Sequence, residues 1–112
     1  MACYRVLLRL PEGASKEITV GADQHIWDAA YAAGLELPSI CHQGRCLTCA
    51  GRLLAPGDFD SSDAVAYFPQ DRAEGFILLC TARPRSDLEI ETHQQYLMRE
   101  HRKKLKLPAP YS

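Results

Sequence analysis

The sequence predicts a single α+β domain with a mixed sheet of four to five strands and one main helix. Its 112 residues fit one domain, because domains of roughly 100–150 residues are the commonest size. Several short runs alternate between apolar and polar residues, which is typical of strands, and one stretch has helical spacing. With 46% hydrophobic and 24% charged residues, the composition is close to the average for folded proteins and excludes a disordered or collagen-like chain.

The first third of the chain predicts a hairpin followed by the main helix. Residues 4–10 alternate imperfectly and residues 16–20 alternate, and the Pro-Glu-Gly sequence at 11–13 is a turn signal between them. Apolar residues then recur at helical spacing over 26–33, and Gly34 stands just past the end. We expect a helix of about two to three turns there, which needs tertiary contacts because short helices are marginal alone.

Further elements are predicted in the second half. Strands are expected at residues 50–54, 76–79 and 88–92, and a short helix at 61–67 with a serine cap. Residues 39–48 are too rich in cysteine, glycine and polar side chains for a helix or strand, so we expect a loop.

Charge is distributed unevenly along the chain. Residues 1–97 contain 8 Lys/Arg and 13 Asp/Glu, a net charge of −5, whereas residues 98–112 contain 5 and 1, a net charge of +4. The total of −1 predicts neither a nucleic-acid partner nor membrane insertion. The tail predicts an extra helix whose apolar face holds Leu97, Met98, His101 and Leu105. It could pack on the body or bind a partner, and both interpretations stay open.

The most informative pattern is a set of four cysteines. Cys41, Cys46 and Cys49 form C-x4-C-x2-C, and Cys80 follows after 30 intervening residues. This spacing is typical of the four thiolate ligands of a [2Fe–2S] cluster, in which each of two sulfide-bridged irons takes two thiolates. Gly44 would let the loop backbone approach the cluster closely.

Other uses of the cysteines fit less well. Structural zinc sites usually have two close ligand pairs, but Cys80 has no neighbouring Cys or His. A thioredoxin-like pair would use Cys46 and Cys49, yet it leaves Cys41 unexplained. Disulfides are rare in the cytosolic setting that we expect for this chain, which shows no secretory leader. Cys3 is expected to be a small strand residue and not a ligand.

Residues 37–51 resemble the cluster-binding loop of plant-type ferredoxins from cyanobacteria and plastids. Further matches are Asp28-Ala29-Ala30, Asp60-x-Ser62-Asp63, Gly75-x-x-Leu78-x-Cys80-x-Ala82, Pro84-x-Ser86-Asp87 and Ile90-x-Thr92-His93. The resemblance covers about residues 3 to 95 and implies a β-grasp fold with one [2Fe–2S] cluster. It divides the chain into a ferredoxin domain, residues 1–95, and a basic C-terminal extension, residues 96–112.

The chain departs from the family pattern around the cluster. Family members usually have Ser and Arg on either side of the first ligand, where this chain has Ile40 and His42. Losing the serine donor lowers the reduction potential, whereas the cationic Arg45 raises it. We therefore expect a potential displaced from the roughly −400 mV of plant-type clusters, in a direction that the sequence leaves open.

The positions at which family members bind their redox partners also differ in this chain. The family carries an acidic run where this chain has residues 66–70, with Asp71 the nearest acid, and an acid close after the late histidine where Gln94 and Gln95 follow His93. Complementary charge mainly sets the association rate, so we expect weaker steering toward basic partners. The resemblance implies photosystem I or ferredoxin-dependent reductases as partners.

The predicted function is one-electron transfer between larger redox proteins, without enzymatic activity, by a soluble monomer of the bacterial cytosol or, after processing, the plastid stroma. Two other classes stay open: an iron–sulfur sensor or regulator that uses the cluster state to control a partner, and an interaction module in which the cluster is structural. The reductase domain of a larger oxygenase is disfavoured because no G-x-G-x-x-G motif is present.

Overall fold

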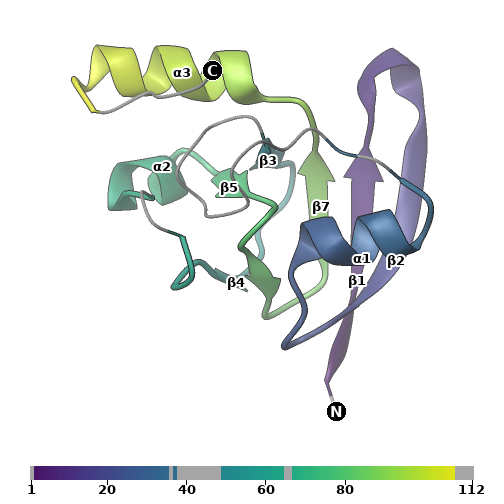
Figure 1. Ribbon diagram of the computed structural model, residues 1–112. Coiled ribbons are helices and arrows are strands. Elements are labelled where there is room, and N and C mark those ends of the chain that lie inside the picture. The colour runs from purple at the N-terminus through teal and green to yellow at the C-terminus, as the bar shows by residue number, and fades with distance from the viewer. Residues whose placement is uncertain (1, 36, 38–48, 65–66, 108–112) are drawn as a thin grey trace.

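The computed structural model describes residues 2–35, 37, 49–64 and 67–107, and it has a mixed five-stranded sheet with helices packed around it (Figure 1). In the sheet the strand order is β2-β1-β7-β3-β5, and a second sheet pairs β4 with β6. The elements are β1 (Cys3–Arg9), η1 (Pro11–Gly13), β2 (Ser15–Gly21), α1 (Ile26–Ala32), β3 (Ala50–Leu53), β4 (Phe59–Asp60), α2 (Pro69–Ala73), β5 (Phe76–Leu78), β6 (Arg83–Pro84), β7 (Leu88–Glu91) and α3 (Gln95–Lys104). The predicted α+β class with a mixed sheet, one helix after the hairpin and a C-terminal helix is confirmed.

The hairpin and the parallel pairing of its first strand explain the mixed sheet. β1 and β2 are antiparallel, with Val6 opposite Ile18, whereas β1 and β7 are parallel, with Val6 opposite Leu88. Alternate side chains of β1, Val6 and Leu8, are fully buried, as the sequence alternation predicts. β1 is therefore a central strand, and β7 joins it to the half of the sheet that contains β3 and β5.

Helix α1 lies across one face of this sheet (Figure 1). Its apolar side chains Ile26, Ala29 and Ala30 are buried in the main core. Gly34 follows with a φ of +88°, a conformation that glycine adopts without steric cost, and this ends the helix where the sequence predicts. The helix has 7 residues, so its stability depends on this packing.

The short helix predicted at residues 61–67 is wrong in the part of that segment that the structure describes. Residues 61–64 form turns, and the Asp60 Oδ1 accepts the Ser62 N–H at 2.8 Å, which offers the backbone an alternative to a helix. The helix instead begins at Pro69, and the Asp71 carboxylate accepts the N–H of Phe68 at 2.9 Å. Pro and an acidic residue both favour the first turn of a helix, and here they determine where α2 starts.

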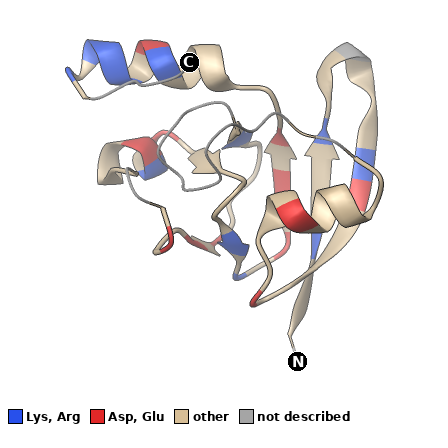
Figure 2. Cartoon of the chain, viewed as in Figure 1, with Lys and Arg blue, Asp and Glu red and all other residues tan. Residues whose placement is uncertain are grey.

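Helix α3 packs above α2 and the β3–β5 end of the sheet (Figure 1). Lys and Arg residues gather on α3 (Figure 2), whose last turn contains Arg102, Lys103 and Lys104. Of the predicted apolar face, Met98 is fully buried, but Leu97 and Leu105 are 50% and 46% exposed, and Arg102, which the sequence does not predict on that face, is fully buried. No helix within the described residues has the length and apolar character that crossing a membrane requires.

Candidate functional site

Two of the four predicted ligands, Cys49 and Cys80, belong to the part of the chain that the structure describes. Cys49 directly precedes β3, and Cys80 comes two residues after the end of β5. The other two, Cys41 and Cys46, lie outside the described residues. So do the rest of the predicted loop and the substituted positions beside the first ligand.

Strand pairing brings the two described thiols together. β3 and β5 are antiparallel, with Ala50 opposite Leu78, so the start of one strand lies beside the end of the other. The N–H of Leu79 donates to the Cys49 carbonyl at 3.2 Å and extends this pairing. The Sγ atoms of Cys49 and Cys80 are 2.9 Å apart, although 30 residues separate them in the sequence.

A tight turn and the start of α1 hold Cys80 in place. The Leu78 carbonyl accepts the N–H groups of Thr81 at 3.3 Å and of Ala82 at 3.0 Å, so the chain reverses at the cysteine. On the other side, the N–H groups of Ile26 and Trp27 donate to the carbonyls of Ala82 and Leu79 at 3.0 and 2.9 Å. These first-turn amides have no partner within their own helix, and they bind the turn instead.

The two cysteines are part of an apolar cluster separate from the main core, which we call the second core. Its buried members are Cys49, Ala50, Phe76, Leu78, Cys80 and Met98. Trp27, Ala64 and Tyr67 pack against them and are partly buried. Both cysteines are only 2% exposed, so solvent has almost no access to this side of the thiol pair.

Close approach of the strands beside Cys49 requires a glycine. A Cβ on Gly51 would lie 2.7 Å from the Ile90 side chain and 3.1 Å from the Glu91 carbonyl. Both distances are shorter than ordinary van der Waals contact, so β3 can approach β7 this closely only without a side chain at position 51.

Tyr67, which packs against the second core, has a hydrogen-bonding role that the sequence does not indicate. Its hydroxyl donates to the Phe76 carbonyl, and burial raises the pKa of Tyr67 above its usual value of 10.0. The phenol therefore stays protonated and keeps donating at all ordinary pH values. This bond ties the segment before α2 to β5.

The donor set and its surroundings fit an iron–sulfur group. Two convergent thiols can serve as soft thiolate ligands, and iron–sulfur clusters are held by Cys thiolates. The hydroxyl of Thr81, next to Cys80, is buried and has no hydrogen-bond partner within the structure as described. A buried polar atom of this kind normally has a partner, and sulfur atoms at the site could accept from it.

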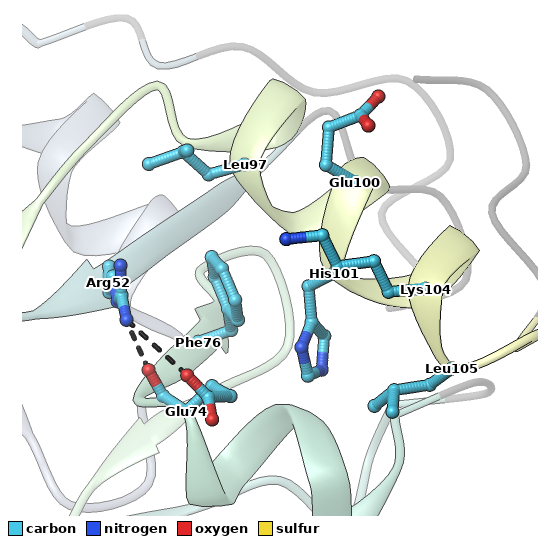
Figure 3. Close-up of a pocket in the computed structure, with 8 residues that line it drawn as sticks. All are labelled: Arg52, Glu74, Phe76, Leu97, Glu100, His101, Lys104 and Leu105. Carbon is cyan, nitrogen blue, oxygen red and sulfur yellow. Dashed lines mark hydrogen bonds and ion pairs between the residues drawn. The ribbon is translucent and has the colours of Figure 1, made fainter.

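One groove is lined by residues of α3 and does not lie at the thiol pair. It has a volume of about 380 Å³ and lies between α3 and the strands β3 and β5 (Figure 3). Phe76 and His101 line this groove, as does Arg52, which forms an ion pair with Glu74 at 3.6 Å (Figure 3). Its lining contains no cysteine, so this groove is a surface feature separate from the cysteine site.

Comparison with known families decides between the chemistries that a thiol pair permits. Residues 10–85 match the family model described as "2Fe-2S iron-sulfur cluster binding domain". The chain belongs to the [2Fe–2S] ferredoxin family. It is similar to Ferredoxin-2 of a Synechococcus species, with 45% identity over 95 residues, covering 85% of this chain and 89% of the relative. It is also similar to the heterocyst ferredoxin of Microchaete diplosiphon, with 38% identity over 96 residues, covering 85% and 96%.

Solved structures agree with the fold. The crystal structure of Pectocin M2 at 1.86 Å matches with a TM-score of 0.72 and 33% identity, covering 83% of this ferredoxin. The ferredoxin spans only 33% of that longer chain. The expected β-grasp ferredoxin fold and the [2Fe–2S] cofactor are confirmed. The protein is an electron carrier and not an enzyme.

Proposed function

We propose that Cys41, Cys46, Cys49 and Cys80 are the four thiolate ligands of the [2Fe–2S] cluster. The observation that carries this assignment is the convergence of the Cys49 and Cys80 sulfur atoms at 2.9 Å inside an apolar core. The C-x4-C-x2-C spacing supports the other two, because it ends at Cys49 and is typical of [2Fe–2S] ligands. When bound, the cluster supplies the one-electron redox chemistry.

The protein's own residues bind and shield this group. Thiolates are the form in which cysteine binds metal, and the paired strand ends fix two of them in position. Burial of Cys49 and Cys80 keeps water from their side of the site and lowers the local polarity, which is one of the properties that set a reduction potential.

The proposed partners are redox proteins of the kind that ferredoxins serve, photosystem I or ferredoxin-dependent reductases. Relatives named as chloroplastic in maize and as heterocyst ferredoxins support a place in the cytosol or plastid stroma. Acidic docking is weak, however. Asp71, the acid nearest to the segment that is acidic in the family, is 0% exposed and forms an ion pair with Arg102 at 2.8 Å. It is therefore not available to steer a basic partner.

The first experiment is an anaerobic visible spectrum and low-temperature EPR of the isolated and dithionite-reduced protein, with a potential titration and size-exclusion chromatography on the same sample. We expect a brown monomer that gives one rhombic S = 1/2 signal on reduction. A colourless protein that retains about one zinc per chain after preparation under iron-replete anaerobic conditions would overturn the proposed function.

Substitution of single cysteines tests the ligand assignment. Cys41→Ala, Cys46→Ala, Cys49→Ala and Cys80→Ala should each abolish the wild-type spectrum. Cys3→Ala is the matched control, because Cys3 is exposed at the start of β1 and should leave the spectrum unchanged. A wild-type spectrum in any of the first four variants would remove that residue from the ligand set.

Partner choice is tested by measuring how fast the reduced protein transfers electrons to one basic and one acidic acceptor at several salt concentrations. With weak acidic steering, transfer to basic cytochrome c should fall only slightly as salt rises. A steep fall would show that acids other than Asp71 steer basic partners.

A further inference from the structure

Helix α3 of the C-terminal extension contributes a side chain to the core that contains the proposed ligands. Met98 is fully buried and packs in the second core with Cys49 and Cys80. The extension therefore reaches the side of the fold that contains the proposed ligands. Methionine suits this place, because its flexible thioether fills irregular gaps beside other groups.

A buried ion pair fixes the far end of this helix. The guanidinium of Arg102 donates to both oxygens of Asp71 on α2, from Nη2 at 2.8 Å and from Nε at 3.3 Å. Both side chains are fully buried, and the Arg102 guanidinium also lies 4.9 Å from the centroid of the Phe68 ring. Met98 and Arg102 are four residues apart and so occupy the same helix face. Pairing of Arg102 consequently sets the rotation that turns Met98 inward.

The near end of the helix is attached directly beside a proposed ligand. The N–H of Gln94 donates to the Ala50 carbonyl at 3.0 Å, and Ala50 follows Cys49 in the chain. The Gln94 carbonyl then accepts the N–H of Met98 at 3.0 Å, which begins the helical bonding. Met98 is thus held between an attachment at β3 and an ion pair at α2.

We propose that α3 is a lid on the metal centre, and that Met98 lowers the reduction potential and slows cluster loss by keeping water from the Cys49 and Cys80 sulfur atoms. This inference rests on the proposed ligand set. Reduction adds one negative charge to the site, and an apolar, water-free environment disfavours added charge. A polar group or water at position 98 would stabilise the reduced form and raise the potential.

Three substitutions of Met98 test the lid, and Leu97→Gln is the matched control because Leu97 is 50% exposed on the same helix. Met98→Gln and Met98→Ala should shift the reduction equilibrium about three- to tenfold toward the reduced form, where tenfold corresponds to about 59 mV for one electron. Both should also lose iron to a chelator faster. Met98→Leu, which keeps apolar volume, and Leu97→Gln should keep the wild-type potential.

A measurement on the protein with Met98 in place keeps the proposal testable if Met98→Gln or Met98→Ala fails to fold. The chain has two methionines, so labelling their methyl groups with ¹³C gives at most two signals, and Met98→Leu assigns one of them. The Met98 signal should be strongly shifted or broadened by the paramagnetic reduced cluster. A sharp Met98 signal at its ordinary position in the reduced protein would overturn the lid.

The outcomes separate the lid from the ligand assignment. If Cys80→Ala loses the cluster spectrum while fully loaded Met98→Gln and Met98→Ala keep the wild-type potential, the ligands are right and the lid is wrong. If Cys80→Ala keeps the spectrum, the proposed ligand set itself fails. A helix that only stabilises the fold would change the unfolding rate without moving the potential.

Discussion

Replacing Arg102 by methionine should destabilise the protein strongly, because it leaves the Asp71 carboxylate buried without its main partner. Both side chains are 0% exposed, and the closest approach between their charged groups is 2.8 Å. Breaking such a pair from one side typically costs about 3–5 kcal/mol. The lower end of this range applies here, since the Phe68 N–H still donates to the carboxylate at 2.9 Å.

Because cofactor loss makes unfolding irreversible, the effect is best measured as a rate. A cost of about 3 kcal/mol corresponds to unfolding faster by about a hundredfold, provided that the pair is already broken in the transition state. The assay follows the bleaching of the visible cluster absorbance at fixed temperature in guanidinium under anaerobic conditions. Lys103→Met, an exposed neighbour on α3, is the matched control and should stay near the wild-type rate.

A double substitution tests whether the unpaired buried carboxylate causes the loss of stability. Asp71→Asn combined with Arg102→Met removes both buried charges and keeps an acceptor for the Phe68 N–H, so it should recover much of the lost stability. The reasoning is refuted if Arg102→Met unfolds within threefold of the wild-type rate. It is also refuted if the double variant unfolds as fast as Arg102→Met alone.

Three further predictions concern other contacts. Gly51→Ala should cost about 1–3 kcal/mol and lower the thermal midpoint, because its Cβ would lie 2.7 Å from a side chain of β7; an unchanged midpoint would contradict this. Tyr67→Phe should cost about 1–2 kcal/mol in the same assay by leaving the Phe76 carbonyl without its donor. The hydrogen bond from His25 lowers the pKa of Asp63 below 3.8, so its stabilisation is present above pH 3.8 and is lost as the pH falls through the lowered value. Asp63→Asn should therefore make the acid limb of the thermal midpoint against pH shallower, and an identical limb would argue against this.

The sequence predicts most of the sheet because its pattern there is strong. Alternation in residues 4–10, 16–20 and 88–92 matches strands that are buried on one side, and these strands form as predicted. The strands β4 and β6 have two residues each, which is too short to produce any periodic signal. Their pairing depends on tertiary contacts that a single sequence does not reveal.

The C-terminal helix shows where sequence periodicity fails. From hydrophobicity alone, Leu97 and Leu105 are expected on the inner face of the helix. Arg102 is not expected there, because arginine is almost never fully buried. The structure instead buries Arg102 beside Met98, and the two leucines are about half exposed. The ion pair with Asp71 decides the rotation of the helix, and it joins residues 31 positions apart. No local pattern contains that information, although the spacing of four between positions 98 and 102 is consistent with it.

The same ion pair also determines which charges of α3 are buried and which stay exposed, and exposed charges affect the reduction potential of the metal centre. Asp71 is neutralised inside the fold, while Lys103 and Lys104 are exposed on the outer side of α3. Positive charge outside the centre favours the reduced state, whereas exclusion of water by Met98 disfavours it. Salt separates these opposing contributions, because it screens exposed charges and leaves the effect of burial almost unchanged. At high ionic strength the lysine contribution falls away, so the difference in potential between the wild-type protein and a variant with Lys103→Gln and Lys104→Gln should shrink toward zero.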